Sequence, residues 1–272
     1  MTKSPGLWML AGVVLTFALG GSLGAQPPAA DPLAQYREML GGDNPADLWE
    51  TRGEDLWNSP RGPMNAALNQ CDLGLGAGIV KGAYAQLPRY FADTDEVQDL
   101  ESRLLSCMTR LQGLNREQIL VNRFGDGENH KSELEALVAF IVAQSRNMKM
   151  SVPSDKPQER AAYALGEKIF FYRAGTHDFS CATCHSQDDK RVRLQSVPNL
   201  TKAVGAQAAY VTWPAYRVSQ GEVRTMEWRL NDCFRQQRLP ELIYGSEAAV
   251  ALTEYLAKNA DGAPLAAPGI KR

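Results

Sequence analysis

The chain has 272 residues, of which 44% are hydrophobic and 22% are charged, and its formal net charge is −2. This composition is that of an ordinary globular protein and excludes collagen-like, coiled-coil and wholly disordered chains. Because 29 basic residues nearly balance 31 acidic ones, no strong overall field attracts nucleic acid or an anionic membrane surface. The length fits two domains of modest size, and we expect no nucleic-acid partner.

The first 25 residues have the three-part pattern of an export signal. Lys3 gives a positive start, residues 7–19 form an uncharged apolar run, and small residues at positions 20–25 precede a Pro-rich stretch. This pattern predicts a secretory signal peptide over residues 1–25 and a mature chain in the periplasm. The alternative is an uncleaved anchor, but the run is Gly-rich and short for a bilayer. After cleavage we expect no membrane association, because no later segment is long and apolar enough.

The rest of the chain is predicted to be mostly helical. Apolar residues recur at intervals of three and four in several segments, whereas strand-like alternation is weak. The clearest helical segments are residues 97–105, 134–141, 161–170 and 246–260. A Pro-containing linker at residues 151–157 separates two halves, so we predict two tandem domains at residues 26–150 and 151–272.

A weak internal repeat connects the two halves. The pattern R-L-x-x-C occurs at residues 103–107 and at residues 229–233, and an apolar helical segment follows each copy. The second half also contains C-A-T-C-H at residues 181–185. The matching place in the first half is residues 71–75, which has one Cys but neither the second Cys nor the His. The repeat therefore indicates a duplicated domain with one intact and one degenerate copy.

The motif C-A-T-C-H is the most specific feature of the sequence. In an exported protein, C-x-x-C-H is typical of covalent haem c attachment, with thioether bonds to Cys181 and Cys184 and with His185 as an iron ligand. A redox-active or disulfide C-x-x-C would need a βαβ context that the helical pattern lacks. A zinc site would need a second pair of ligands nearby. We therefore predict one covalent haem c in the second half and none in the first.

The residue pattern leaves the second axial ligand of the iron open. Met226 is the only methionine after the motif, and Met is the usual ligand in small cytochromes c. Cysteine parity favours a different residue, because haem attachment leaves Cys71, Cys107 and Cys233 in an oxidising compartment. If the loss of a haem let Cys71 and Cys107 form a disulfide, Cys233 would remain as the sulfur beside the iron. A buried, inert thiol is the alternative for Cys233.

Together, the export signal, the degenerate first copy, the C-x-x-C-H motif and the R-L-x-x-C-F segment resemble SoxA, the larger subunit of the SoxAX cytochromes. The resemblance covers nearly the whole mature chain and is to the single-haem members. It implies two cytochrome c-like domains and an L-cysteine S-thiosulfotransferase activity. It implies that Cys233 is the axial and catalytic residue and carries a persulfide. It also implies that Arg229 and Lys258 are basic residues of the substrate channel.

The implied reaction joins thiosulfate oxidatively to a cysteine of a SoxYZ-like sulfur carrier. A new S–S bond releases two electrons and one haem accepts one, so the reaction needs a second acceptor nearby. The resemblance supplies a SoxX-like cytochrome c as a heterodimer partner. Two other functions fit the haem motif: an electron-transfer cytochrome c with His185 and Met226 as ligands, and a haem-based sensor with an exchangeable sixth position.

Overall fold

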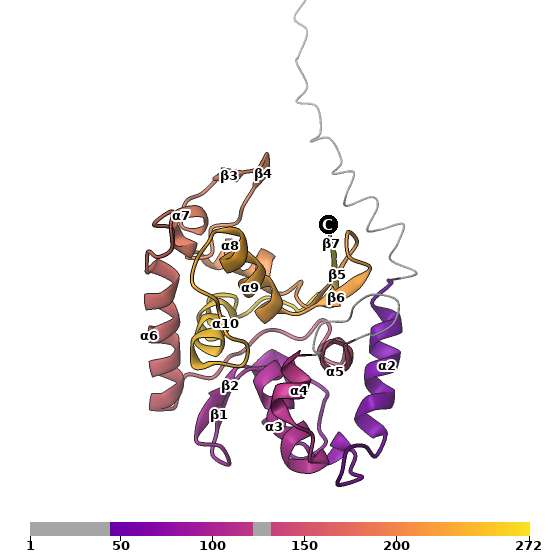
Figure 1. The fold of residues 1–272 in the computed structure, drawn as a ribbon. Coiled ribbons are helices and arrows are strands. Elements are labelled where there is room, and N and C mark those ends of the chain that lie inside the picture. The colour runs from indigo at the N-terminus through magenta and orange to yellow at the C-terminus, as the bar shows by residue number, and fades with distance from the viewer. Residues whose placement is uncertain (1–43, 122–131) are drawn as a thin grey trace, which may run out of the picture. The chain divides into compact units, whose positions relative to one another are not determined.

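The computed structural model describes residues 44–121 and 132–272, which belong to one compact unit (Figure 1). Most of its regular structure is helical, which confirms the predicted class. The predicted signal peptide lies outside the described residues. Among the helices of the described ranges, none is long and apolar enough to cross a membrane.

Short strands and turns connect the helices. The first half contains α2 (Asp47–Asn58), η1 (Leu68–Gln70), η2 (Tyr84–Gln86), β1 (Arg89–Phe91), β2 (Glu96–Gln98), α3 (Leu100–Gln112), α4 (Arg116–Val121) and α5 (Glu133–Ala143). The second half contains α6 (Pro157–Phe171), α7 (Cys181–His185), β3 (Arg191–Val192), β4 (Gln195–Ser196), α8 (Ala203–Tyr210), β5 (Ala215–Arg217), β6 (Glu222–Arg224), α9 (Met226–Gln236), α10 (Glu247–Asn259) and β7 (Gly269–Lys271). Strands β1 and β2 form one antiparallel hairpin and β3 and β4 another, while β5 lies between antiparallel β6 and parallel β7.

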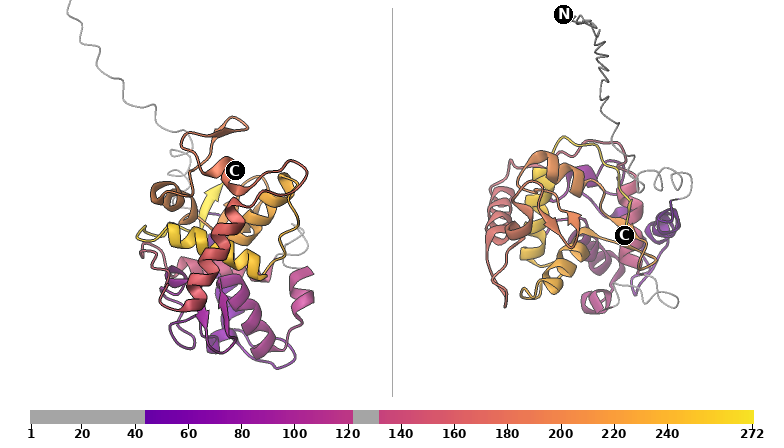
Figure 2. Two further views of the ribbon diagram at one scale, coloured as in Figure 1. Left: turned by 90° about the vertical axis from the view of Figure 1, so that its left-hand side faces the viewer. Right: turned by 90° about the horizontal axis from the view of Figure 1, so that it is seen from above.

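The two halves repeat the same arrangement of elements. In the first half α2 packs against α5, and in the second half α6 packs against α10 (Figures 1 and 2). In the first half the cis proline Pro88 precedes the β1–β2 hairpin and α3. In the second half the cis proline Pro214 precedes the β5–β6 hairpin and α9. Equivalent residues in this part are 126 positions apart, as these two prolines are. The structure therefore contains the duplication that the short sequence repeat indicated.

Each packed helix pair crosses at a glycine. A Cβ atom added at Gly166 of α6 would lie 2.0 Å from the Ala251 carbonyl oxygen of α10. A Cβ atom added at Gly53 of α2 would lie 2.0 Å from the Ala136 carbonyl oxygen of α5. At these two positions the helix backbones touch and leave no space for a methyl group. Glycine is therefore required by packing, although it lowers the intrinsic stability of a helix.

We expect Gly166→Ala to lower the free energy of unfolding by about 2 kcal/mol. Overpacking a tight contact typically costs ~1–3 kcal/mol and more where a backbone must move, and the gain in helix propensity is only about 1 kcal/mol. Ala164→Gly at an exposed position of the same helix is the matched control, because it changes helix propensity without touching α10. Denaturant unfolding measures both variants. A Gly166→Ala protein as stable as the wild type would contradict the close crossing.

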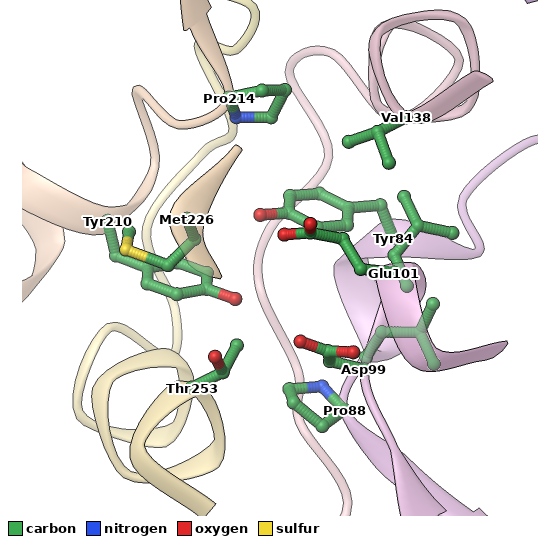
Figure 3. Close-up of a pocket in the computed structure, with 11 residues that line it drawn as sticks. Tyr84, Pro88, Asp99, Glu101, Val138, Tyr210, Pro214, Met226 and Thr253 are labelled. Carbon is green, nitrogen blue, oxygen red and sulfur yellow. The ribbon is translucent and has the colours of Figure 1, made fainter. Parts of the chain in front are cut away.

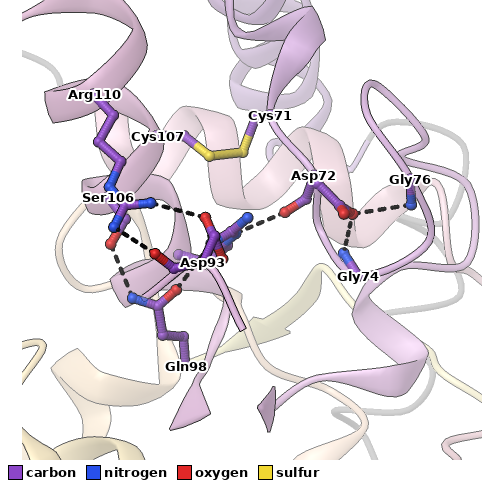
Figure 4. Close-up of a disulfide and its surroundings, with 10 residues drawn as sticks. Cys71, Asp72, Gly74, Gly76, Asp93, Gln98, Ser106, Cys107 and Arg110 are labelled. Carbon is purple, nitrogen blue, oxygen red and sulfur yellow. Dashed lines mark hydrogen bonds and ion pairs between the residues drawn. A yellow bond between two sulfur atoms is a disulfide. The ribbon is translucent and has the colours of Figure 1, made fainter. Parts of the chain in front are cut away.

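The first half contains the expected disulfide between Cys71 and Cys107, with an S–S distance of 2.02 Å (Figure 4). Cys71 directly follows η1, Cys107 lies on α3, and both are buried. Arg103, one turn before Cys107, donates to the Asp72 carbonyl oxygen at 2.6 Å and pairs with Asp93 at 2.9 Å. The arginine of this R-L-x-x-C copy thus holds the disulfide region together.

The structure corrects the register of the internal repeat near the cysteines. Gly62 and Gly175 are equivalent, because both have positive φ and both lie against a helix end. A Cβ added at Gly62 would meet the Gln112 carbonyl oxygen at the end of α3, and one added at Gly175 would meet the Arg238 carbonyl oxygen just beyond α9. The two glycines are 113 positions apart, and η1 and α7 begin with the same separation. Cys71 is therefore equivalent to Cys184, not to Cys181 as the sequence comparison placed it. A single matched cysteine was too little to fix the register there.

Candidate functional site

The C-x-x-C-H motif forms the short helix α7. The Ser180 hydroxyl accepts a hydrogen bond from the Thr183 N–H at 3.2 Å, and the Ser180 N–H donates to Thr183 Oγ1 at 3.0 Å. This reciprocal cap fixes the start of the helix. Residues three apart lie on the same side of a helix, so Cys181 and Cys184 are neighbours there. Both are free thiols.

The His185 ring is oriented by a backbone carbonyl. Its Nδ1 lies 2.9 Å from the Pro198 carbonyl oxygen. Because a carbonyl only accepts, Nδ1 carries the proton and Nε2 keeps its lone pair. The pKa of His185 is lowered from its ordinary value, mainly because the ring is buried. The contact with Pro198 partly offsets this effect, and the charge of Arg229 adds to it. The imidazole is therefore neutral at pH 7, with one nitrogen available as a metal ligand.

Helix α9 carries Arg229 and Cys233 one turn apart. The Thr225 hydroxyl caps the helix by accepting from a backbone N–H of the first turn at 3.2 Å. The pKa of the Cys233 thiol is raised, mainly because the thiol is buried. The charge of Arg229 opposes this rise, and Cys184 adds to it. Burial, followed by the proximity of Cys233, raises the pKa of Cys181 to about 12. Cys181 of α7 and Cys233 of α9 therefore lie in one poorly solvated region.

A cavity of about 580 Å³ opens beside these side chains. Its volume lies within the range of ~300–1,000 Å³ that is typical of small-molecule and cofactor sites. Cys181, His185, Arg229 and Cys233 contribute to its wall. The rest of the wall is mainly apolar and includes Phe170, Leu200, Trp213, Leu230, Phe234, Leu252 and Leu256. The donor set and the apolar wall fit a covalently attached haem c.

Both sulfur ligands that the sequence analysis considered reach this cavity. Met226, the first residue of α9, lines the cavity and is buried. Cys233, seven residues later on the same helix, lines it as well. Spacing pointed to Met226 and cysteine parity to Cys233, and the fold brings both residues to a single site.

Arg229, the arginine of the second R-L-x-x-C copy, is more exposed and less tightly ion-paired than Arg103 of the first copy. Arg103 is buried and held by Asp93, whereas the Arg229 side chain is 38% exposed. Arg229 approaches Asp232 at 3.4 Å, but that carboxylate binds Arg235 more closely, at 2.7 Å. Arg229 is therefore more available to a ligand than the equivalent residue of the first half.

Arg217 is a cavity residue that the sequence analysis missed. It ends β5 and lines the cavity together with Arg229 and Lys271. Its Nε is buried and donates to no acceptor within the described ranges. Burial lowers the pKa of Arg217, and repulsion from Arg229 lowers it further. Two guanidinium groups in one wall favour a bound anion. No motif marks Arg217, because only the β5–β6 hairpin brings it beside α9.

Lys258 lies elsewhere. Its Nζ donates to the Val152 carbonyl oxygen at 2.6 Å and pairs with Asp261 at 2.8 Å. It thus ties the linker between the halves to α10, and the residues that line the cavity do not include it. Leu256 of the same helix does line the cavity. Lys258 comes two residues later, and a step of two residues along a helix places a side chain on a different face.

Comparison with known proteins gives a family match in both halves. A family model described as the cytochrome c domain of SoxA/TsdA matches residues 52–150 and 165–265. One domain model thus matches twice, which confirms two cytochrome c-like regions. The crystal structure of SoxXA from P. pantotrophus superposes with a TM-score of 0.70 at 23% identity, covering 89% of this chain and 84% of that chain. That similarity shows a shared fold.

Sequence relatives carry one name. A protein named L-cysteine S-thiosulfotransferase subunit SoxA from Hydrogenophilus thermoluteolus is 52% identical over 88% of this chain and 87% of its own length. Two proteins of that name from Hydrogenobacter thermophilus are 31% and 32% identical, over 98% and 91% of this chain and 99% and 93% of their own lengths. The chain therefore belongs to the SoxA family, within the SoxA/TsdA group of cytochrome c domains.

Proposed function

We propose that this chain is the catalytic haem-thiolate subunit of an L-cysteine S-thiosulfotransferase, which joins thiosulfate to a cysteine of a sulfur carrier protein. The observation that carries the proposal is the single cavity that unites Cys181, His185, Arg229 and Cys233. The names of the relatives, which include this activity, support it.

Helix α7 and helix α9 would together hold one haem c. Cys181 and Cys184 would form the thioether bonds, His185 would bind the iron through Nε2, and the Cys233 sulfur, bare or as a persulfide, would be the second protein ligand. When bound, haem c supplies a one-electron acceptor in contact with the reacting sulfur. The Pro198 carbonyl keeps the imidazole in the required tautomer.

We propose that the first half holds no haem. The residues equivalent to Cys184 and Cys233 are Cys71 and Cys107, and these are joined in a disulfide. Asp72 takes the position of the histidine, and its Oδ1 accepts hydrogen bonds from backbone N–H groups of its own loop. At these described positions, neither a free thiol for a thioether bond nor a ligand for iron is therefore available.

The cavity side chains suit an anionic sulfur substrate. Arg217 and Arg229 would bind the oxygens of thiosulfate. Formation of an S–S bond between the outer sulfur of thiosulfate and the Cys233 thiol releases one proton and two electrons. A thiolate of the carrier then attacks that outer sulfur, so the new S–S bond forms on the carrier as the bond to Cys233 breaks. Burial raises the pKa of the Cys233 thiol, and the charge of Arg229 opposes that rise and so favours the reactive thiolate.

We further propose a SoxX-like cytochrome c as heterodimer partner, a SoxYZ-like carrier as acceptor and the periplasm as location. Two electrons leave for each S–S bond, so one haem in this chain needs a second one-electron acceptor close by. The word subunit in the names of the relatives, and the SoxXA complex with the same fold, support such a partner. The predicted export signal at residues 1–25 supports the location.

Electron paramagnetic resonance of the oxidised holoprotein tests the axial ligand. We expect a low-spin thiolate-type signal that persists in Met226→Leu and is lost in Cys233→Met. Covalent haem is expected in all three proteins and is measured by haem staining after denaturing electrophoresis. A His/Met-type signal that changes only in Met226→Leu would instead support the electron-transfer cytochrome, and this proposal would be withdrawn.

Arg217→Gln is expected to raise KM for thiosulfate about tenfold to a hundredfold with a smaller change in kcat. A hydrogen bond to a charged group contributes ~1.5–3 kcal/mol, and about 1.4 kcal/mol corresponds to a factor of ten. Arg217→Lys keeps the charge and is expected to recover part of the affinity. Arg173→Gln is the control, since Arg173 is 62% exposed, pairs with Asp178 and does not line the cavity. Unchanged kinetics in Arg217→Gln would place the anion elsewhere.

A further inference from the structure

The cavity of about 580 Å³ is closed toward the first half of the chain. Tyr210 and Met226, which line it on that side, are buried. Figure 3 shows both side chains facing Tyr84 and Glu101 of the first half across a smaller cavity of about 20 Å³. Phe170 of α6, which also lines the larger cavity, is buried as well. A partner protein therefore cannot reach the larger cavity from these sides.

The exposed side of the larger cavity is formed by the β3–β4 hairpin and α8. Among the residues that line the cavity, the exposed ones are Gln195 and Ser196 of β4 and Ala208 of α8. Figure 1 shows the hairpin extending beyond α7 and α8. A carrier protein that reacts with the Cys233 sulfur would therefore approach along this hairpin.

The hairpin turns through two residues with large side chains. Arg193 and Leu194 have φ angles of 49° and 65°, a left-handed conformation that bulky residues rarely adopt and that two-residue hairpin turns usually assign to Asn or Gly. Residues held in such conformations are concentrated at functional sites. Arg193 is exposed and Leu194 is 88% exposed, so core packing does not explain either side chain. The tip therefore presents one basic and one apolar side chain to solvent.

Arg193 reaches from the hairpin to α9, close to Cys233. Its Nη1 donates to Gln236 Oε1 at 2.8 Å, and Gln236 Nε2 donates to Asp232 Oδ2 at 2.6 Å. Gln236 follows Cys233 by one helix turn, so it lies on the same side of α9. Because Gln236 is a neutral amide, this hydrogen bond leaves the positive charge of Arg193 uncompensated. Burial raises the pKa of the Cys233 thiol, and the charges of Arg229 and, more weakly, Arg193 oppose that rise, which places Arg193 within electrostatic range of the sulfur.

The proposed transfer brings two negative charges together at this side of the cavity. A thiolate of the carrier approaches the thiosulfate group on Cys233, whose sulfonate is anionic, and repulsion between the like charges opposes the approach. After transfer the sulfonate leaves with the carrier, whereas Arg217 and Arg229 remain in the cavity wall. A cation on the exposed side would reduce the repulsion and bind the sulfonate as it leaves. Arg193 is a cation in that position.

We propose that the β3–β4 hairpin is the docking site for the cysteine-bearing segment of the sulfur carrier. Arg193 pairs with the carrier thiolate as it approaches and with the transferred sulfonate as it leaves, while Leu194 packs against apolar atoms of the same segment. The bond changes are those of the proposed transfer: the S–S bond to Cys233 breaks as the bond to the carrier sulfur forms, and Cys233 leaves as a thiolate. This exchange needs no further oxidant. The inference rests on the proposed function.

Two-substrate kinetics of the haem-loaded protein test this docking site. We expect Arg193→Gln to raise KM for the purified carrier about tenfold, because one charged hydrogen-bonding partner is lost, and to leave KM for thiosulfate unchanged. The dependence of the carrier KM on ionic strength should also weaken. Arg193→Glu is expected to raise the carrier KM further, and Arg193→Lys to keep most of the affinity. Arg160→Gln on α6 is the control, because Arg160 is exposed and also donates to neutral acceptors, at 3.0 and 2.7 Å.

Replacing Leu194 with the photoreactive residue benzoylphenylalanine tests the contact directly. Irradiation with the purified carrier is expected to cross-link the carrier peptide that contains the accepting cysteine, as identified by mass spectrometry. The same replacement at Leu48 of α2, which is 70% exposed, is the control and should give no such cross-link. Normal carrier KM in both Arg193→Gln and Arg193→Glu, or a cross-link only to other carrier peptides, would overturn this inference and leave the proposed function standing. A wild-type protein that transfers no thiosulfate to the carrier would instead overturn the proposed function.

Discussion

Cys233→Ala is expected to abolish the transfer of thiosulfate to the carrier, with a loss of at least about a thousandfold, as is typical when a covalent nucleophile is removed. In the proposed mechanism the new S–S bond forms first on this sulfur, and no other described thiol can replace it. Cys181 and Cys184 would be held in thioether bonds, and Cys71 and Cys107 are joined in a disulfide. The mass increase of the carrier cysteine measures the transfer directly.

Loss of an iron ligand must be distinguished from loss of a nucleophile. Cys233→Met is the informative variant, because a thioether can bind iron but cannot form the S–S bond with thiosulfate. We expect it to keep covalent haem and low-spin iron and still to lack transfer. Transfer within tenfold of wild type in this variant would show that Cys233 is not the catalytic sulfur. Loss of transfer together with loss of haem in Cys233→Ala alone would not distinguish the two roles, so both variants are measured.

The parts of the site that the sequence predicted are set by short-range patterns. The C-x-x-C-H motif carries its own helix start, because Ser180 and Thr183 cap each other over three residues. The four-residue spacing of Arg229 and Cys233 likewise places both on one helix face. The odd number of cysteines together with the internal repeat predicted the Cys71–Cys107 pairing, and the structure contains it.

The parts that the sequence did not predict depend on contacts between distant segments. Arg217 reaches the cavity through a hairpin of two three-residue strands, which no periodicity reveals. Gly166 looks unfavourable in a helix until the Ala251 carbonyl is found beside it. Lys258 lies on the expected helix, but its rotation about the helix axis follows from packing and not from its position in the chain.

The equivalence of Cys71 with Cys184 and of Cys107 with Cys233 explains how one scaffold supports two different cores. In the first half a direct S–S bond joins α3 to the turn where a cofactor would otherwise lie. In the second half the same two positions are free thiols, and one of them, Cys233, lines the cavity. The covalent link between helix and loop would thus be supplied by a disulfide in one half and by haem c in the other. The first half would then serve as a rigid support for the second.

Removing the disulfide with Cys71→Ala/Cys107→Ala is therefore expected to lower the free energy of unfolding by about 4 kcal/mol without changing the haem. The cysteines are 36 residues apart, and closing a loop of that length restricts the unfolded chain by about that amount. Denaturant unfolding of the haem-loaded protein measures the loss, and the electron paramagnetic resonance signal should match the wild type. The double variant avoids leaving a single buried thiol that could mispair with Cys233. A stability within about 1 kcal/mol of the wild type would contradict a stabilising role. A changed haem signal would show that the first half influences the haem site through the interface that the two halves share.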